Sequence, residues 1–277
     1  MELKIRKAER KQRKARIAIA GPSGSGKTMT ALRLAQGLKT SGRILVLDTE
    51  RASSTLYADK IDFDQVDLPD YEYETFLSGI KLAAEGDYDV LIIDSVSHAW
   101  ESFLEAHGKM QGNSFTNWAK ITPKYNDLIR AMVTYPGHII ATMRAKTEYV
   151  LSENDKGKQT PQRVGMGVIM RPGSEYEFDV VMMGDVHHNF TVEKTRLDWL
   201  ADKIITKPGE ELGKQIREWL DSGKEVAYLY RIDSLSDDKK PQAEIYLKSM
   251  GAEWLQPLGL WKSAKELPKL VNFLVKE

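Results

Sequence analysis

The sequence predicts an α/β fold, in which helices flank both faces of a mostly parallel central sheet. Four short apolar segments predict its buried strands, at residues 16–20, 43–48, 89–94 and 138–142. The segments between them are longer, and their apolar residues recur at the spacing of a helix. Strands that alternate with helices in this way are typical of a parallel sheet, because each crossover helix returns the chain to the edge where the next strand begins.

The other elements are justified by periodicity and turn residues. Apolar residues at helical spacing predict helices at 28–38, 71–85, 98–110, 123–133 and 210–220. Alternating or continuous apolar residues predict further strands at 61–68, 178–183 and 189–196. A β-hairpin insertion is predicted over 148–164, with its turn at the Asn-Asp-Lys-Gly sequence of 154–157.

Three parts are expected along the chain. Residues 1–16 form a basic arm, with eight basic residues against one Glu between positions 4 and 16. The arm is either a solvated segment or a contact to a phosphate backbone. Residues 17–208 form the core. Residues 209–277 are expected to form a small helix-rich unit, which several prolines punctuate.

Composition limits the classes of protein that this chain can be. Its 277 residues, 42% of them hydrophobic, suit one large domain or one α/β domain with an appendage. Lys+Arg and Asp+Glu each number 40, so any affinity for nucleic acid must come from local patches. The absence of Cys excludes disulfides, thiolate catalysis and cysteine-based zinc sites. Without an apolar run of membrane-span length or a signal-peptide core, we expect a cytoplasmic protein with no membrane contact.

A glycine-rich motif joins the first predicted strand to the first predicted helix. Residues 21–28 read G-x-x-x-x-G-K-T. Such glycines let successive backbone N–H groups point inward at phosphate oxygens, and the helix N-terminus adds a partial positive charge. Lys27 would reach the β- and γ-phosphates, and the Thr28 hydroxyl would hold Mg²⁺. The motif predicts a nucleoside triphosphate site made by Gly21, Ser23, Gly24, Ser25, Gly26, Lys27, Thr28 and Met29.

Acidic residues follow two of the predicted strands. Asp94 ends the strand 89–94, where it would hold Mg²⁺ while Ser95 lines the nucleotide. The alternative for Asp94 is a helix cap. Glu50 lies just past the strand 43–48, where a carboxylate can orient the water that attacks the γ-phosphate while Asp48 supports the metal. The alternative for Glu50 is a surface residue paired with Arg51.

Together these motifs make the chain similar to the RecA-like ATPases. In that family the strand after the phosphate-loop helix ends in Asp-x-Glu, which here is Asp48-Thr-Glu50, and the Glu is the catalytic carboxylate. The family's Walker B strand, Val-x-x-Asp-Ser-Val, matches residues 90–96 with one extra apolar residue. The chain also resembles the phage-encoded Sak-type ATPases of single-strand annealing and recombination, at residues 21–28, 93–100, 156–158, 175–179 and 194–196. The resemblance covers residues 5–208, implies ATP with Mg²⁺, and places the protein in a bacterial host cytosol.

The resemblance implies two further kinds of site residue. One kind lies at the end of the strand after Walker B and senses the γ-phosphate. Thr142 and Arg144 lie at this position here, whereas RecA itself has an amide side chain there. The other is basic and reaches the nucleotide of a neighbouring subunit, as Lys194 and Arg196 would. Because such a cation speeds hydrolysis by orders of magnitude, turnover would depend on assembly. The alternative is a solvated strand edge guarded by cations.

Two segments are predicted to contact single-stranded DNA by analogy with the family. In the first, 109–120, a polar loop presents Phe115 and Trp118 for stacking on unpaired bases, beside Lys120. The alternative is that these rings are packed in the core. The second is the hairpin region. Its acidic residues argue against contact with DNA. Its basic residues would follow the phosphates of the strand: Lys146, Lys156, Lys158, Arg163 and Arg171.

The function predicted from the sequence is that of a RecA-like ATPase that binds single-stranded DNA and promotes annealing or strand exchange in phage recombination. It would act as a homo-oligomer, either a ring or a filament, with a single-strand binding protein or annealing factor as a plausible partner. One alternative is a nucleotide-gated adaptor or loader that moves a protein partner without touching DNA. Another is a small-molecule kinase, which Glu50 disfavours because an activated water would waste ATP.

Overall fold

The structure, a computed structural model, describes residues 7–263 except 41, 87, 154–158, 225–227, 231, 233–234 and 257–259. It consists of two compact units. The larger, which we call the core unit, comprises residues 14–219, and the smaller unit combines residues 1–13 with 220–277. The sequence analysis placed the helix after Pro208 in a C-terminal unit, whereas nearly all of this helix belongs to the core unit.

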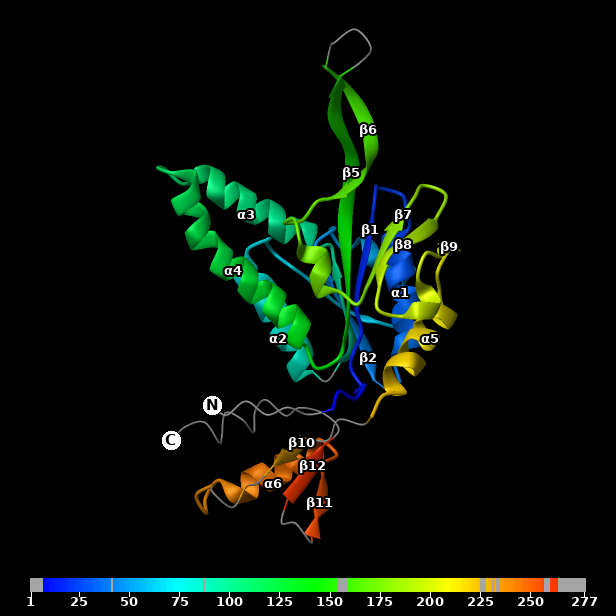
Figure 1. Ribbon diagram of the computed structural model, residues 1–277. Helices are drawn as coiled ribbons and strands as arrows, with labels where there is room; N and C mark the ends of the chain where they lie inside the picture. Colours follow the sequence, from blue (N-terminus) through cyan, green and yellow to red (C-terminus); the bar gives the residue numbers. More distant parts are fainter. Residues whose placement is uncertain are drawn as a thin grey trace. The chain divides into compact units, whose positions relative to one another are not determined.

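A nine-stranded sheet forms the centre of the core unit (Figure 1). Its strands follow the order β3-β2-β4-β5-β1-β7-β8-β9, and β6 pairs with β5 outside this path. Neighbours from β3 to β7 are parallel, and β8 and β9 are antiparallel additions. The bounds are β1 Arg16–Gly21, β2 Arg43–Asp48, β3 Asp64–Asp67, β4 Tyr88–Asp94, β5 His138–Glu153, β6 Gln159–Val168, β7 Val180–Gly184, β8 Asn189–Thr195 and β9 Ile204–Thr206.

Helices cover both faces of the sheet, with α2, α3 and α4 on one face and α1 and α5 on the other (Figure 1). Every second strand residue, such as Leu91 and Ile93, joins Phe76, Trp100 and Tyr125 in one buried cluster. The predicted α/β class with a mostly parallel sheet is confirmed. Among the described residues, no helix is both long and apolar enough to span a membrane. The bounds are α1 Lys27–Leu38, α2 Tyr73–Glu85, α3 Ser97–Lys109, α4 Ser114–Thr134 and α5 Glu210–Asp221.

The strand order brings several strand ends to one edge of the sheet. In register, Asp48 of β2 lies opposite Asp94 of β4, and Ile19 of β1 lies opposite Thr142 of β5. Because these strands are parallel, their carboxyl ends open into the same crevice. The segments that follow Gly21, Asp48 and Asp94 are therefore neighbours in space, although they lie far apart in the chain.

The predicted hairpin is present and begins earlier than expected. β5 is a single 16-residue strand that starts inside the sheet and continues beyond it, where it pairs with β6. This pairing starts at Ala145, opposite Val168, rather than at residue 148. The hairpin projects past the edge at which β1, β2 and β4 end (Figure 1). Its predicted turn at 154–157 lies outside the described residues.

The prediction that a helix begins at Pro123 is wrong, because α4 begins nine residues earlier, at Ser114. The Asn113 side chain caps it by accepting the Phe115 N–H at 2.8 Å. Proline inside a helix costs about 3 kcal/mol or more, because it removes a backbone donor. A continuous buried stripe offsets this cost by packing both halves of α4 on the core: Asn117, Ile121, Tyr125, Leu128 and Met132.

The described part of the smaller unit is less helix-rich than predicted. Its described residues form one helix, α6 (Lys240–Ser249), and a three-stranded antiparallel sheet of β10 (Tyr228–Tyr230), β12 (Leu260–Ser263) and β11 (Glu253–Leu255). Pro241 lies in the first turn of α6, where its missing N–H is harmless, so it begins the helix rather than interrupting one. The arm joins this unit, since the backbone N–H of Gln12 donates to the Lys224 carbonyl at 2.9 Å.

The contact between α1 and α5 predicts a site where an added methyl group is poorly tolerated. A Cβ on Gly213 would lie 2.2 Å from the Leu34 carbonyl oxygen, which is backbone and cannot rotate away. We expect Gly213→Ala to lower the free energy of unfolding by about 1–3 kcal/mol through overpacking. Gly108 is the control, because it is an exposed helical glycine with open space around it. Gly108→Ala should be neutral or stabilising by about 0.5–1 kcal/mol in urea unfolding.

Candidate nucleotide-binding site

The phosphate loop, residues 21–28, has the shape that its glycines allow. Gly24 and Gly26 adopt left-handed backbone angles, with φ of 77° and 84°. A Cβ on Gly21 would lie 2.5 Å from the Ser25 hydroxyl oxygen and 3.0 Å from the Gly184 carbonyl oxygen, so a side chain there would require the loop to shift. Ser25 is buried, and its hydroxyl donates to the Pro22 carbonyl at 2.9 Å. The loop leads into the N-terminus of α1, which is an anion-binding arrangement.

Lys27 and Thr28 begin α1 at the end of this loop. The Lys27 ammonium donates to the Pro22 carbonyl at 3.0 Å, which holds the side chain over the loop. Burial lowers the pKa of Lys27, and the nearby carboxylates of Asp94 and Glu50 oppose this effect. The Thr28 hydroxyl donates to Asp94 Oδ2 at 2.6 Å. The Lys27 ammonium therefore lies near both carboxylates predicted for this site, those of Asp94 and Glu50.

Asp94 is buried at the end of β4, with an exposed fraction of 2%. Its other oxygen, Oδ1, accepts a hydrogen bond from the Thr142 hydroxyl. Burial raises the pKa of Asp94, and the hydrogen bonds from Thr142 and Thr28 oppose this. Mg²⁺ prefers oxygen ligands and keeps several of its waters. The adjacent Thr28 hydroxyl and Asp94 carboxylate fit this requirement.

Glu50 pairs with Arg144 rather than with Arg51. The Arg144 guanidinium donates to both Glu50 oxygens, with Nε to Oε1 at 3.1 Å and one terminal nitrogen to Oε1 and Oε2 at 2.8 and 3.0 Å. Arg144 also lies 3.9 Å from a carboxylate oxygen of Glu101. Asp48 orients the segment that carries Glu50, because its Oδ1 accepts the Glu50 N–H at 2.6 Å and its Oδ2 accepts the Ser54 hydroxyl at 2.6 Å.

A cavity of about 550 Å³ connects these groups. The predicted residues on its wall are Gly21, Ser23, Gly24, Gly26, Lys27, Thr28, Glu50, Asp94 and Arg144. Five others predicted to hold the nucleotide or metal are absent from this wall: Ser25, Met29, Asp48, Ser95 and Thr142. Of these, Thr142 acts on the site through Asp94, and Asp48 acts through the segment 50–54. The Ser95 hydroxyl is buried without a hydrogen-bond partner among the described residues.

The sequence analysis did not identify Thr49 and His98 as part of the site. The Thr49 hydroxyl accepts the Ser95 N–H at 2.7 Å and lies 2.6 Å from His98 Nδ1. Tyr71 stacks on His98 with ring centroids 4.4 Å apart. Burial, helped by the charge of Arg144, lowers the pKa of His98. This network ties the end of β2 to the end of β4, and so fixes where Glu50 and Asp94 lie relative to each other.

His188 also lines the cavity, and it lies in the turn between β7 and β8. Its Nδ1 lies 3.1 Å from the carbonyl oxygen of Ser25 in the phosphate loop. Ser53 and Tyr57 also line the cavity, from the short 3₁₀ helix η1 (Ser53–Tyr57) that follows Glu50. No motif marks these positions. Only the sheet order brings the turn after β7 beside the loop after β1.

Lys194 and Arg196 lie away from this cavity. β8 runs antiparallel to β7, so Thr195 pairs with Val180 at the amino end of β7, while the phosphate loop follows the carboxyl end of β1. The Lys194 ammonium donates to the carbonyls of Glu175, Tyr176 and Phe178 at 2.8, 2.8 and 2.7 Å. Arg196 is half-exposed and pairs with Asp179 at 3.3 Å. Neither cation reaches the nucleotide cavity of its own chain.

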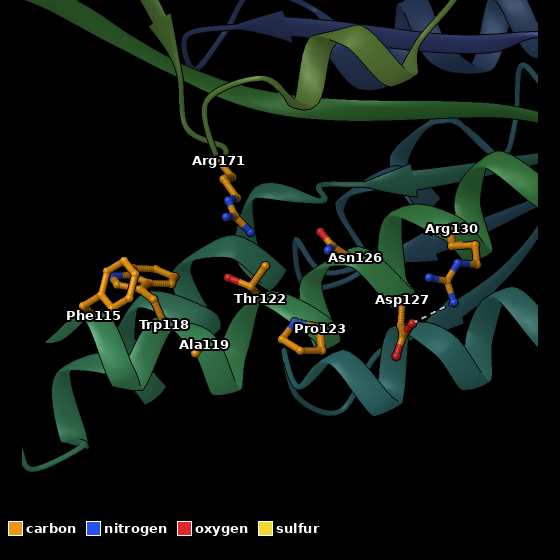
Figure 2. Close-up of a pocket in the computed structure, with 9 residues that line it drawn as sticks. All are labelled: Phe115, Trp118, Ala119, Thr122, Pro123, Asn126, Asp127, Arg130 and Arg171. Atoms are coloured by element: carbon orange, nitrogen blue, oxygen red, sulfur yellow. Dashed lines mark hydrogen bonds and ion pairs between the residues drawn. The ribbon is translucent and has the colours of Figure 1, made fainter. Parts of the chain in front are cut away.

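The two segments predicted to contact DNA meet at a second hollow, which we call the α4 groove. It has a volume of about 520 Å³ and is lined by Phe115, Trp118, Ala119, Thr122, Pro123, Asn126, Asp127, Arg130 and Arg171. Figure 2 shows Arg171 reaching over α4 from the opposite wall, and Arg130 paired with Asp127. Phe115 is 86% exposed. Trp118 is half-buried, because it stacks between His107 and Trp100 at centroid distances of 4.4 and 5.7 Å.

The other predicted DNA contacts are spread around the hairpin and α4. Lys120 and Lys146 are exposed and do not line the α4 groove. Lys156 and Lys158 lie outside the described residues, and so does the side chain of Arg163. The described residues therefore bring together an exposed ring, a stacked ring and one cation, at Phe115, Trp118 and Arg171.

Comparison with known proteins agrees with this geometry. The chain matches the AAA domain family (AAA_24) over residues 13–200. It is 37% identical to protein RecA of Methylococcus capsulatus over 99 residues, which cover 34% of this chain and 28% of that protein. It is 37% identical to protein RecA of Anaplasma marginale over 86 residues, covering 29% and 24%, and 34% identical to that of Allochromatium vinosum over 99 residues, covering 34% and 28%. The chain thus matches less than a third of the length of these RecA proteins. Because the family match covers most of the core unit, the chain belongs to the AAA domain family, with the core of a RecA-like P-loop ATPase.

Proposed function

We propose that this protein hydrolyses ATP and couples hydrolysis to single-stranded DNA, promoting annealing or strand exchange of the kind found in phage recombination systems. One observation carries the proposal. β5 places Thr142 and Arg144 at the nucleotide site and then continues, without interruption, as one strand of the projecting hairpin. A change at the γ-phosphate that moves Arg144 would therefore act directly on the strand that leads to the DNA-binding region.

The charged and hydroxyl groups predicted for the site divide the work of this hydrolysis. Glu50 orients the attacking water once Arg144 turns to the γ-phosphate, and Lys27 contacts the β- and γ-phosphates. Thr28 and Asp94 would hold Mg²⁺, which when bound neutralises charge on the phosphates. Thr142 keeps the Asp94 carboxylate in place. Lys194 and Arg196 are proposed to face the nucleotide of a neighbouring copy, which requires a homo-oligomer and release of Lys194 from its three carbonyl partners.

The α4 groove is proposed as the place where an unpaired base stacks. An aromatic ring accepts any base, because every base has a π-face, and a nearby cation follows the backbone. Phe115 supplies an exposed ring, and Arg171 supplies the cation on the facing wall (Figure 2). Lys120 and Lys146 would extend the path of the phosphates. The pairing of Arg130 with Asp127 leaves Arg171 as the cation best placed to act.

Truncating the exposed ring is expected to weaken DNA binding. Stacking of one base on an aromatic ring contributes about 1–3 kcal/mol, so Phe115→Ala should raise the Kd for oligo(dT) about tenfold. The ring is exposed, so the fold should persist. Leu82→Ala removes an exposed side chain from α2, away from the groove, and should leave the Kd unchanged. Fluorescence anisotropy of labelled oligo(dT) measures both, and equal effects of the two variants would remove Phe115 from the DNA site.

The overall proposal is tested by ATP turnover with and without single-stranded DNA at two salt concentrations. We expect DNA to stimulate turnover and DNA binding to weaken steeply with salt, because phosphate contacts release counterions. Lys27→Ala should abolish turnover and so exclude a contaminating ATPase. A turnover rate that DNA does not change would favour a nucleotide-gated adaptor that acts on a protein partner. Phosphate transferred to a small molecule would show a kinase.

A further inference from the structure

The turn between β7 and β8 is held rigidly beside the phosphate loop. Asp185 Oδ1 accepts the backbone N–H groups of His187 and Asn189 at 2.8 and 2.9 Å. The His188 N–H donates to the Asp185 carbonyl at 3.1 Å, and the His188 carbonyl accepts the Lys207 N–H at 2.8 Å. His188 itself has a left-handed φ of 64°, which His, Asn and Asp adopt more readily than most residues. The turn thus fixes where the imidazole of His188 lies.

The imidazole contacts the loop at one peptide group. His188 Nδ1 lies 3.1 Å from the Ser25 carbonyl oxygen. A carbonyl oxygen only accepts hydrogen bonds, so Nδ1 must carry the proton and donate. The ring also lies close to Gly26, since a Cβ there would be 3.0 Å from Nδ1. This contact spans 163 positions in the sequence and joins two segments that otherwise belong to different strand connections.

This hydrogen bond determines which way a loop N–H points. The Ser25 carbonyl and the Gly26 N–H belong to one planar peptide group, and in a trans peptide they point in opposite directions. Holding the carbonyl toward His188 therefore turns the Gly26 N–H toward the other side of the loop. In loops of this kind the backbone N–H groups cradle the β- and γ-phosphates. A donor on the carbonyl also polarises the same peptide and strengthens its N–H as a donor.

We infer that His188 is a positioning residue for nucleotide binding, which orients the Gly26 N–H toward the phosphates by donating a hydrogen bond to the Ser25 carbonyl. The inference rests on the phosphate-binding role of the loop within the proposed function, and it needs neither hydrolysis nor DNA. Because Gly26 has no Cβ, its backbone is permissive, so without His188 the peptide between Ser25 and Gly26 can rotate more freely. His188 removes this freedom before the nucleotide arrives, which is how a preorganised site gains affinity.

The test compares His188→Asn with His188→Gly. Both residues accept the left-handed φ, and both are uncharged, but only Asn has an N–H donor one bond beyond Cγ, where the His188 Nδ1 lies. We expect His188→Gly to raise the Kd for ADP about tenfold and His188→Asn to stay within about twofold of the wild type. Titration calorimetry with ADP measures this without any turnover. In ATP hydrolysis, KM should rise for His188→Gly while kcat at saturation stays the same, as for a loss of uniform binding.

A purely structural role would give a different pattern. If His188 only stabilised the turn, both variants would lower the Tm of the nucleotide-free protein and neither would change the Kd for ADP at a temperature where both are folded. An unchanged Kd in His188→Gly, or an equal loss in both variants, would overturn the inference. Failure of the proposed ATPase and DNA activities would appear separately, as wild-type protein that binds ADP tightly but shows no turnover that DNA stimulates.

Discussion

Replacing Glu50 with Gln is expected to lower the kcat for ATP by about 10²- to 10⁴-fold, the usual contribution of a positioned general base. Gln keeps the size of Glu and can still accept hydrogen bonds, so the cavity should remain intact. It cannot take up a proton from the attacking water near neutral pH. ATP and ADP should therefore bind to the variant with nearly unchanged Kd, and only the chemical step should be lost.

The pairing of Glu50 supplies the control for this experiment. Arg144 is bonded to Glu50 and also lies 3.9 Å from Glu101, which is not on the cavity wall. Glu101→Gln removes the second carboxylate near Arg144 while leaving the first, and it should change kcat by less than about twofold, as expected for a partly exposed, distant pair. Phosphate release at saturating ATP measures both variants. Equal turnover in Glu50→Gln and wild type would exclude Glu50 as the catalytic base.

The pairing of Glu50 with Arg144 predicts low turnover by the protein alone. Arg144 donates to both Glu50 oxygens at 2.8–3.1 Å and so takes up part of the acceptor capacity that an attacking water would use. A move of Arg144 toward the γ-phosphate would release both oxygens for a water, and Arg144 sits where β5 passes from the sheet into the hairpin. A ligand that bends or shifts the hairpin would alter this pair first. In the proposed function, coupling between the two ends of β5 would thus run along one strand rather than through a long chain of contacts.

Much of the site could be predicted because its chemistry lies in short, local patterns. The glycines and Lys27-Thr28 identify the phosphate loop within eight residues. The centres of β2 and β4 are apolar, so the ends of these strands are visible in the sequence. Asp94 is the last residue of β4, and Glu50 lies two residues past the end of β2. The parallel sheet then brings both carboxylates to the same edge.

The parts that could not be predicted depend on strand order and side-chain direction. Arg144 was placed near the nucleotide, but its pairing with Glu50 depends on β4 lying between β2 and β5, which no local pattern specifies. His188 reaches the loop because β7 lies beside β1. The prediction at Pro123 was wrong for a different reason. Proline usually begins a helix, but Pro123 lies inside α4, where the packing of the buried stripe outweighs the cost of the proline.

Acidification is expected to destabilise the core unit strongly through His138, at the amino end of β5. This imidazole is 2% exposed, and its Nδ1 accepts the Ala15 N–H at 3.0 Å, which requires the neutral ring. Burial lowers the pKa of His138 from 6.5 to about 3, and the positive charges of Lys14, Arg16 and Arg217 add to this effect. The negative charge of Asp89 opposes it. The unfolded chain therefore takes up a proton below pH 6.5 that the folded chain refuses until about pH 3. Stability is full above pH 6.5 and is lost as the pH falls.

The size of this loss makes it measurable. Since each pH unit between the two pKa values is worth about 1.4 kcal/mol, the loss should reach about 2 kcal/mol at pH 5 and approach about 5 kcal/mol near pH 3. His138→Asn offers an oxygen to the Ala15 N–H but cannot titrate. Urea unfolding at pH 7.5 and pH 5 should show the variant losing about 2 kcal/mol less than wild type. The wild type and the variant have the same carboxylates. If both proteins lose the same free energy of unfolding between pH 7.5 and pH 5, the acid sensitivity comes from those carboxylates and not from His138.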